Sequence, residues 1–171
     1  NVEAATLDCG TSTTLDGLTA CISLQMPQSG SNGFVAPTAS QQADWRTVVR
    51  KMLEGSCSFS LPASLAGIMQ LKPFVDAGNG KTYCVFMEVL DADNNGKVDR
   101  GWGTCITNPD ATRRDLHHSA PHPIFDSTTE VEGVGAFRDT DSLSYLMCGA
   151  HRLANSDANA CQSSYGSADC A

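Results

Sequence analysis

The stretch that decides the fold is residues 116–151, LHHSAPHPIFDSTTEVEGVGAFRDTDSLSYLMCGAH. Its apolar pattern predicts a short strand over 116–120 and a second strand over 143–148. Between them, Ser127 and Glu130 form a Ser-x-x-Glu capping box, which predicts a helix start. About twenty residues separate the strand ends, which suffices for a right-handed crossover between parallel strands. We therefore expect a parallel βαβ unit here.

Upstream of this unit, the pattern predicts one further helix and a hairpin. Ser40 is typical of an N-cap for a helix over 41–54, and Gly55 is typical of its end. The apolar residues of this segment recur with a helical period and are Trp45, Val48, Val49, Met52 and Leu53. Residues 83–90 and 102–107 are rich in β-formers, and the Asn-Gly between them favours a tight antiparallel reversal.

The N-terminal segment, residues 1–39, is rich in Thr, Ser, Gly and Pro, and we expect little regular structure there. The predicted fold class is α/β: a mixed sheet with an antiparallel hairpin and a parallel βαβ unit, stapled by disulfides. A chain of 171 residues suits a single domain over 1–171.

Charge and hydropathy limit the classes of partner. The net charge is −8 and the pI is about 4.7, so the chain has no basic stripe for nucleic acid or for an anionic membrane surface. No apolar run approaches the ~20 residues that span a bilayer. We therefore expect a small-molecule or peptide-like substrate, with neither nucleic acid nor membrane as partner.

The cysteines indicate a secreted protein. There are eight, with no Cys-x-x-Cys pair, which favours four disulfides in an oxidising compartment over a zinc or redox site. The N-terminus carries no signal peptide, so we expect that it has already been removed. Spacing favours Cys9–Cys21 and Cys161–Cys170. Cys84 and Cys105 lie equidistant from the predicted turn and should be bonded, which leaves the pair Cys57–Cys148.

All four histidines lie within residues 117–151. His122 and His151 each follow the C-terminal end of a predicted parallel strand, so both should lie at one edge of the sheet, where open α/β folds place their ligands. With a carboxylate from Asp126 or Glu130 they would bind zinc through three ligands. A fourth position stays open for a water molecule that the metal activates.

Other residues of the same window have predicted roles. Glu130 or Glu132 would act as general base, and Arg152 would hold an anionic group of the substrate. His117 and His118 point to opposite faces of their strand, so at most one of them faces the site. Two alternatives stay open: His122 and Asp126 are a turn residue and a helix cap, or His122 works with a carboxylate in a metal-free acid/base hydrolase.

A second metal is suggested by residues 91–99, DADNNGKVD, which match the first nine positions of a calcium loop through Asp91, Asp93, Asn95 and Asp99. Position twelve is Trp102 instead of the bidentate Glu, and no helix is predicted on either side. The segment is therefore either a structural calcium site or an acidic turn without metal. With calcium and structural histidines, the chain would be a non-enzymatic extracellular binding module.

The short motif Ala120-Pro121-His122-Pro123, with Thr129-Glu130 and the strand that follows, resembles the zinc centre of N-formylglutamate amidohydrolases and poly-γ-glutamate hydrolases. These carboxypeptidase-like enzymes cleave amide bonds next to carboxylates. The resemblance covers about residues 115–155. Pro123 replaces the usual small residue, and Phe125 stands where the family has a carboxylate. A sheet of that family needs more strands than this chain shows, so we expect a piece of a longer protein, or a processed protein with a second chain.

Overall fold

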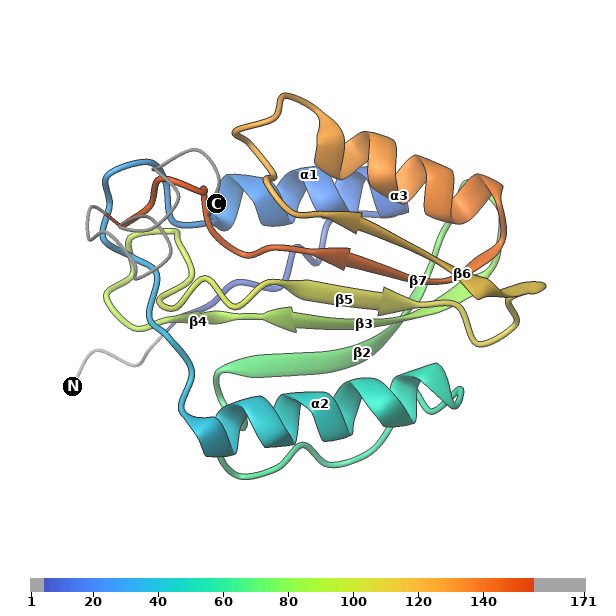
Figure 1. The fold of residues 1–171 in the computed structure, drawn as a ribbon, viewed down its shortest axis with the longest axis horizontal. Helices are drawn as coiled ribbons and strands as arrows, with labels where there is room; N and C mark the ends of the chain where they lie inside the picture. Colours follow the sequence, from blue (N-terminus) through green and yellow to red (C-terminus); the bar gives the residue numbers. More distant parts are fainter. Residues whose placement is uncertain (1–4, 156–171) are drawn as a thin grey trace, which may run out of the picture.

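A computed structural model describes residues 5–155, and its core is one five-stranded mixed sheet (Figure 1). In spatial order the strands are β2 (Met69–Val75), β3 (Thr82–Glu88), β5 (Thr104–Thr107), β7 (Ser142–Met147) and β6 (Arg113–Ala120). All neighbouring pairs are antiparallel except β6 and β7, which are parallel. A separate two-stranded sheet pairs β1 (Ala5–Thr6) with β4 (Leu90–Asp91).

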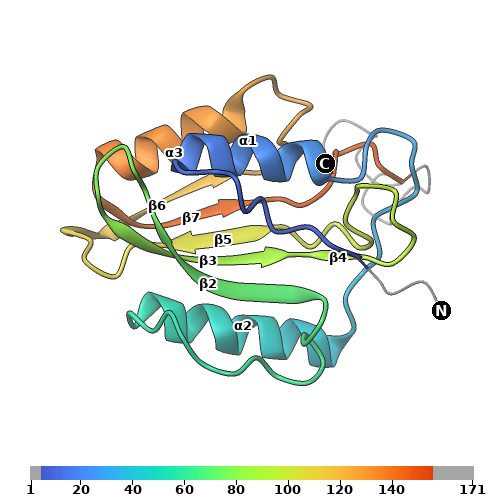
Figure 2. The ribbon, with the colours of Figure 1, turned by 180° about the vertical axis from the view of Figure 1, so that it is seen from behind.

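Helices cover both faces of the sheet, as Figures 1 and 2 show. The helices α1 (Leu15–Gln25) and α3 (Thr129–Asp139) lie side by side on one face, and α2 (Ala39–Leu53) lies on the other. Side chains of β3 therefore meet an apolar layer on each side: Tyr83 packs toward Phe137 of α3, and Phe86 packs toward Trp45 of α2. This double cover explains why β3 is buried along nearly its whole length.

The predicted mixed sheet and its parallel strand–helix–strand unit are confirmed. His118 lies opposite Tyr145 and Ala120 opposite Met147 in the parallel register. The helix between these strands packs so closely that a Cβ on Gly133 would lie 2.8 Å from Cε2 of Tyr145. A glycine that weakens the helix is therefore required by its packing on β7.

The predicted start of this helix is wrong. It begins at Thr129, and its N-cap Thr128 has a φ of 69° and makes no side-chain capping bond. Instead of capping the helix, Glu130 accepts a hydrogen bond through Oε2 from the backbone N–H of Ile124, at 3.4 Å. Thr128, the residue before α3, therefore has a left-handed backbone conformation, which the capping-box pattern did not predict.

The prediction of little regular structure before residue 39 is also wrong, because this segment contains α1. Thr14 caps the helix by accepting a hydrogen bond from the backbone N–H of Gly17. Inside the helix, hydroxyl groups bond back to carbonyl oxygens, as Thr19 does to Leu15 at 2.9 Å. The helix α2 is confirmed near its predicted bounds, although Thr38 and not Ser40 is its N-cap.

The antiparallel pairing of β3 with β5 is confirmed, but the tight hairpin is not. Residues 89–103 leave the sheet between the two strands, and within them β4 pairs with β1. The register consequently places Cys84 opposite Thr107 and Cys105 opposite Phe86, two residues away from the expected pairing. The predicted Cys84–Cys105 disulfide is therefore wrong.

Two disulfides are present among the described residues. Cys9–Cys21 is confirmed, with a Cα–Cα distance of 6.0 Å, and Cys84 is bonded to Cys57, with a Cα–Cα distance of 5.1 Å. The predicted Cys57–Cys148 pair is accordingly wrong. Cys105 is buried and Cys148 exposed, both unbonded within residues 5–155. The predicted pair Cys161–Cys170 lies outside the described residues.

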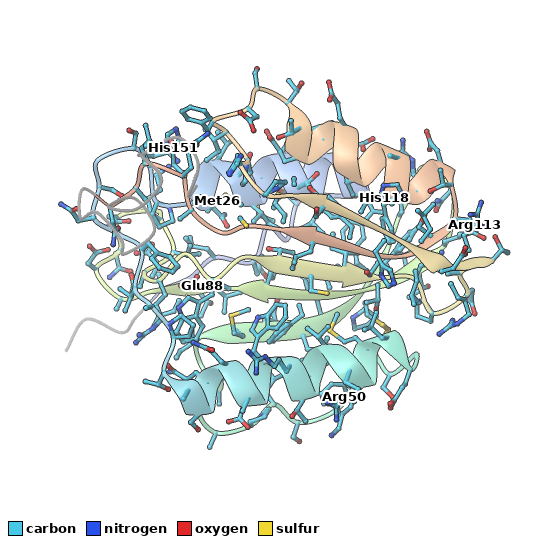
Figure 3. The ribbon with its side chains drawn as sticks, viewed as in Figure 1. Met26, Arg50, Glu88, Arg113, His118 and His151 are labelled. Atoms are coloured by element: carbon cyan, nitrogen blue, oxygen red, sulfur yellow. A yellow bond between two sulfur atoms is a disulfide. The ribbon has the colours of Figure 1, made fainter. Side chains whose placement is uncertain are left out.

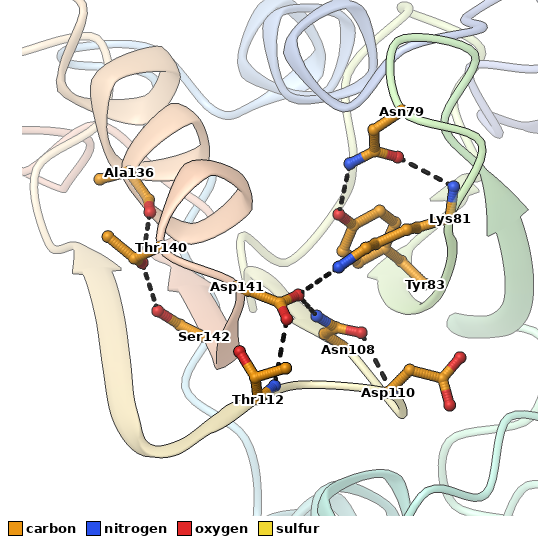
Figure 4. Close-up of polar contacts among 10 residues, drawn as sticks. All are labelled: Asn79, Lys81, Tyr83, Asn108, Asp110, Thr112, Ala136, Thr140, Asp141 and Ser142. Carbon is orange, nitrogen blue, oxygen red and sulfur yellow. Dashed lines mark hydrogen bonds and ion pairs between the residues drawn. The ribbon is translucent and has the colours of Figure 1, made fainter.

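The β2–β3 turn, the β5–β6 loop and the start of β7 meet at one carboxylate (Figure 4). Asp141 accepts hydrogen bonds from the Lys81 ammonium at 2.5 Å, from Nδ2 of Asn108 at 2.8 Å and from the backbone N–H of Thr112 at 3.2 Å. These donors hold the pKa of Asp141 at about 2.

No helix in residues 5–155 is long and apolar enough to cross a membrane.

Candidate functional site

The C-terminal ends of β6 and β7 carry the two histidines that the sequence singled out. Because these strands are parallel neighbours, the segments that leave them start at the same edge of the sheet. His122 follows β6 by two residues and His151 follows β7 by four. In Figure 3, His151 lies at this end of the molecule and Arg113 lies at the opposite end.

His122 is held by a carboxylate four residues further along the chain. Its Nδ1 lies 3.1 Å from Oδ2 of Asp126, and the backbone N–H of Asp126 donates to the carbonyl oxygen of His122 at 3.0 Å. A carboxylate only accepts, so in neutral His122 the proton sits on Nδ1 and the lone pair on Nε2. That Nε2 atom is buried and has no hydrogen-bond partner among the described residues.

His151 belongs to the same neighbourhood through an aromatic ring. The ring of Phe125, the residue before Asp126, meets the ring of His151 edge-on at 5.3 Å between centroids. Nδ1 of His151 accepts a hydrogen bond from the backbone N–H of Leu153 at 3.0 Å. In neutral His151 the proton therefore sits on Nε2, which makes that atom a donor.

Arg152 lies on the same aromatic ring. Its guanidinium carbon is 4.5 Å from the centroid of Phe125, and its Nε is buried without a hydrogen-bond partner in the described part of the chain. Phe125 itself is 42% exposed. The predicted anion-binding arginine thus lies beside His151 at the edge that also carries His122, with an aromatic ring between the two segments.

The three predicted zinc ligands are only partly brought together. Asp126 contacts Nδ1 of His122, which is the position that a carboxylate takes behind a metal-binding histidine and not the position of a metal ligand beside Nε2. His151 presents an N–H and not a lone pair. His122, Asp126 and His151 do not form a group with ligand atoms within 4.8 Å of one another. As placed, they offer one free lone-pair nitrogen, that of His122.

The two predicted bases differ in position. Glu130 lines a cavity of about 290 Å³ between the end of α1, Lys97 and the loop that leads into α3. Glu132 is exposed and accepts a hydrogen bond from the Thr128 hydroxyl at 3.2 Å. Of the two carboxylates, Glu130 is the closer to the His122 loop, because it contacts Ile124 directly.

His117 and His118 point to opposite faces of β6, as predicted, and each contacts serine. Nδ1 of His117 lies 2.7 Å from Oγ of Ser144, and Nε2 of His118 lies 3.0 Å from Oγ of Ser142. Nε2 of His118 is also 3.1 Å from Oγ1 of Thr140. Both rings are engaged in contacts between β6 and the segment 140–144, and Figure 3 shows His118 well separated from His151.

The backbone that carries His151 is fixed by glycines that the sequence patterns did not explain. A Cβ on Gly149 would overlap the backbone nitrogen of Gly103, and one on Gly103, whose φ is 85°, would lie 2.5 Å from the carbonyl oxygen of Met147. Gly103 ends the Gly101-Trp102-Gly103 segment, in which the backbone N–H of Trp102 donates to the Glu88 carboxylate at 2.8 Å. Only one feature of the sequence could have pointed to Glu88: it is a charged residue in an otherwise apolar strand.

The predicted calcium residues come together as a second candidate site. Asp91, Asp93 and Asp99 place one carboxylate oxygen each within 4.8 Å of the others. Backbone N–H groups approach these oxygens, for example that of Asn95 at 3.0 Å from Oδ1 of Asp91. The side-chain oxygen of Asn95 instead accepts from the backbone N–H of Lys97 at 2.8 Å. Three of the four predicted ligands therefore converge.

Comparison with protein-family models, curated proteins and solved structures finds no match to this chain.

Proposed function

We propose that the protein is a secreted hydrolase that cleaves an amide or ester bond near an anionic group, with Nε2 of His122 at its reaction centre. The observation that carries the proposal is the contact of Asp126 with Nδ1 of His122 at 3.1 Å, which leaves Nε2 buried and unpartnered among the described residues. Histidines bound in this way by a carboxylate serve as zinc ligands and as general bases in hydrolases.

Zinc is the cofactor that we propose for this centre: Nε2 of His122 would be one ligand, and the other protein ligands that catalytic zinc takes would have to come from side chains that change tautomer or rotamer. When bound, zinc activates a water molecule and polarises the carbonyl group to be cleaved. Asp126 orients the imidazole through its contact with Nδ1. His151 could become a second ligand only in its other tautomer, since its Nδ1 now accepts from Leu153. The local resemblance of residues 115–155 to zinc amidohydrolases supports the same chemistry.

The remaining residues of the edge bind the substrate in this proposal. The Nε2–H of His151 donates to the oxygen on which negative charge develops, as an oxyanion-hole donor does. The Arg152 guanidinium, stacked on Phe125 with its Nε unpartnered among the described residues, pairs with the anionic group of the substrate. Secretion is supported by the disulfides Cys9–Cys21 and Cys57–Cys84, because such bonds persist in oxidising compartments.

The test combines metal content with hydrolysis of N-acyl amino acids and of p-nitrophenyl esters. We expect one zinc ion per chain, which H122A loses together with activity, and a rate about 10- to 100-fold lower in D126N. The control is H117A, which removes an exposed histidine that contacts Ser144.

Activity that resists chelators but still requires His122 and Asp126 would contradict the zinc part of the proposal. The protein would then be a hydrolase that uses metal-free acid/base catalysis. Full activity in H122A, or no hydrolysis of any substrate by the zinc-loaded protein, would overturn the proposal.

A second candidate, an extracellular binding module with a structural calcium, is favoured by the convergence of Asp91, Asp93 and Asp99. Carboxylate oxygens are the ligands that calcium prefers. If this candidate is right, calcium should raise the melting temperature of the protein. D93N should abolish this rise, and D110N, a substitution at an exposed loop position, should leave it intact. A melting temperature independent of calcium would exclude it.

A further inference from the structure

A cavity of about 290 Å³ opens beside the loop that carries His122, and it does not include the His122 ring. Three segments distant in sequence form it: the end of α1 with the residues after it, the region of Lys97, and the loop 124–128 with the first turn of α3. Its lining includes Leu24, Gln28, Lys97, Ile124, Thr128 and Glu130. Ligand pockets start near ~300 Å³, so this cavity suits a small molecule.

The cavity carries one positive and one negative side chain. The Lys97 ammonium donates one hydrogen bond to the carbonyl oxygen of Leu24, which leaves two of its three N–H groups for a ligand. Among residues 5–155 the Glu130 carboxylate receives only a long bond of 3.4 Å, from the backbone N–H of Ile124, and it can accept further donors. A ligand that carries both charges would satisfy both residues.

The apolar part of the lining comes from aliphatic side chains. Leu24 is 72% exposed and forms the rim, and Ile124 lies half-buried in the loop. Ile124 and Thr128 have φ values of 71° and 69°, although β-branched residues rarely adopt this left-handed region. Strained backbone of this kind is concentrated at ligand-binding and functional sites. The shape of the loop at the cavity is thus maintained against its local preference.

We propose that this cavity binds a free α-amino acid with an aliphatic side chain. The carboxylate of the ligand pairs with Lys97, its ammonium pairs with Glu130, and its side chain packs against Leu24 and Ile124. This inference goes beyond the proposed hydrolase and does not depend on it, because none of these contacts involves Nε2 of His122.

Isothermal titration calorimetry with three related probes tests the proposal. L-leucine carries both charges, 4-methylpentanoate lacks the ammonium group, and isoamylamine lacks the carboxylate; none of them contains a bond that a hydrolase could cleave. Because a charge-assisted hydrogen bond contributes about tenfold or more in affinity, we expect each single-charge probe to bind at least tenfold more weakly than leucine. Absence of leucine binding, or equal binding of 4-methylpentanoate, would overturn the proposal.

Two substitutions assign the charges. K97M should weaken leucine and 4-methylpentanoate about tenfold or more and leave isoamylamine unchanged, and E130Q should do the reverse. The matched control is K72M, because Nζ of Lys72 also donates to a backbone carbonyl, that of Asp8 at 2.7 Å, away from the cavity. Leucine affinity unchanged in both K97M and E130Q would refute the assignment. Leucine binding without hydrolysis would support this inference and contradict the proposed hydrolase. Hydrolysis without leucine binding would support the hydrolase and contradict this inference.

Discussion

Gly149 and Gly103 pack backbone against backbone, so closely that neither position has room for a Cβ. Gly149 leads out of β7 toward His151, and Gly103 leads into β5. The segment that follows β7 and the segment that precedes β5 are therefore in close contact at the start of the candidate site. This contact fixes the positions of His151 and Arg152, because only one residue separates Gly149 from His151.

Replacing Gly149 by alanine should therefore displace the segment that carries His151 and Arg152. The added methyl group meets backbone atoms, which cannot rotate away, and overpacking of this kind costs about 1–3 kcal/mol or more. A fall of the melting temperature by several degrees is expected. Thermal unfolding followed by circular dichroism measures it.

The matched control is G135A in α3, where a Cβ would meet nothing nearer than the guanidinium of Arg138 at 3.9 Å. Alanine favours a helix over glycine by about 1 kcal/mol, so G135A should keep or raise the melting temperature. If G149A melted as high as G135A, the close packing of Gly149 on Gly103 would not be a constraint on the fold.

Glu88 should make the stability of the protein depend on pH. Burial raises the pKa of this carboxyl from 4.5 to about 7, against the backbone N–H groups of Arg100 and Trp102 that favour its charged form. Between these pH values the folded protein retains a proton that the unfolded chain has released. The free energy of unfolding should therefore fall, by about 3 kcal/mol at most, as the pH rises from 4.5 to 7.

Chemical denaturation at a series of pH values measures this slope. E88Q should remove it, because glutamine does not titrate, while E54Q, at an exposed position, should retain it. A wild-type stability that rose over the interval would show that Glu88 is charged in the folded protein throughout.

Local sequence patterns predicted correctly the features that depend on residues close together in the chain. The helix α2 and the β6–α3–β7 unit follow from apolar periods and segment lengths, and Cys9–Cys21 follows from proximity along the chain. The contact between Asp126 and His122 also lies within one short segment, although no pattern in that segment distinguishes a carboxylate that orients His122 from one that binds metal.

Long-range packing decided the features that the sequence analysis missed. Residues 90–91 pair with β1 instead of continuing the hairpin, and Cys105 lies opposite Phe86 instead of Cys84. The cavity between Lys97 and Glu130, and the ring contacts of Phe125, join segments that no periodicity relates. Such relationships depend on the tertiary arrangement, and local propensity does not determine them.

The disulfide of Cys57 with Cys84 predicts a specific peptide map. Digestion without reduction should yield linked peptides that contain these two cysteines, and C84A should destabilise the protein by about 2–4 kcal/mol. C105A serves as the control, since Cys105 is buried but unbonded within residues 5–155, and its loss should cost about 1 kcal/mol through the cavity left behind. Recovery of a Cys84–Cys105 peptide would contradict the register of β3 and β5.

Asp141 should contribute stability that acid removes. Hydrogen bonds from Lys81, Asn108 and the backbone of Thr112 lower its pKa from 3.8 to about 2, so the folded state holds fewer protons than the unfolded chain in this interval. The stabilisation is therefore present above pH about 4 and is lost as the pH falls toward 2.

D141N is the informative substitution, because Asp141 has a φ of 53° and asparagine tolerates the left-handed region. The amide keeps one acceptor oxygen but loses the charge, so we expect a loss of about 1–3 kcal/mol at pH 7 and a shallower loss of stability between pH 4 and 2. D110N, in the same loop region (Figure 4), should behave as wild type. If D141N were as stable as D110N at pH 7, the convergence of three segments on this carboxylate would not stabilise the fold, and the attachment of the β2–β3 turn to β7 would have to rest on other contacts.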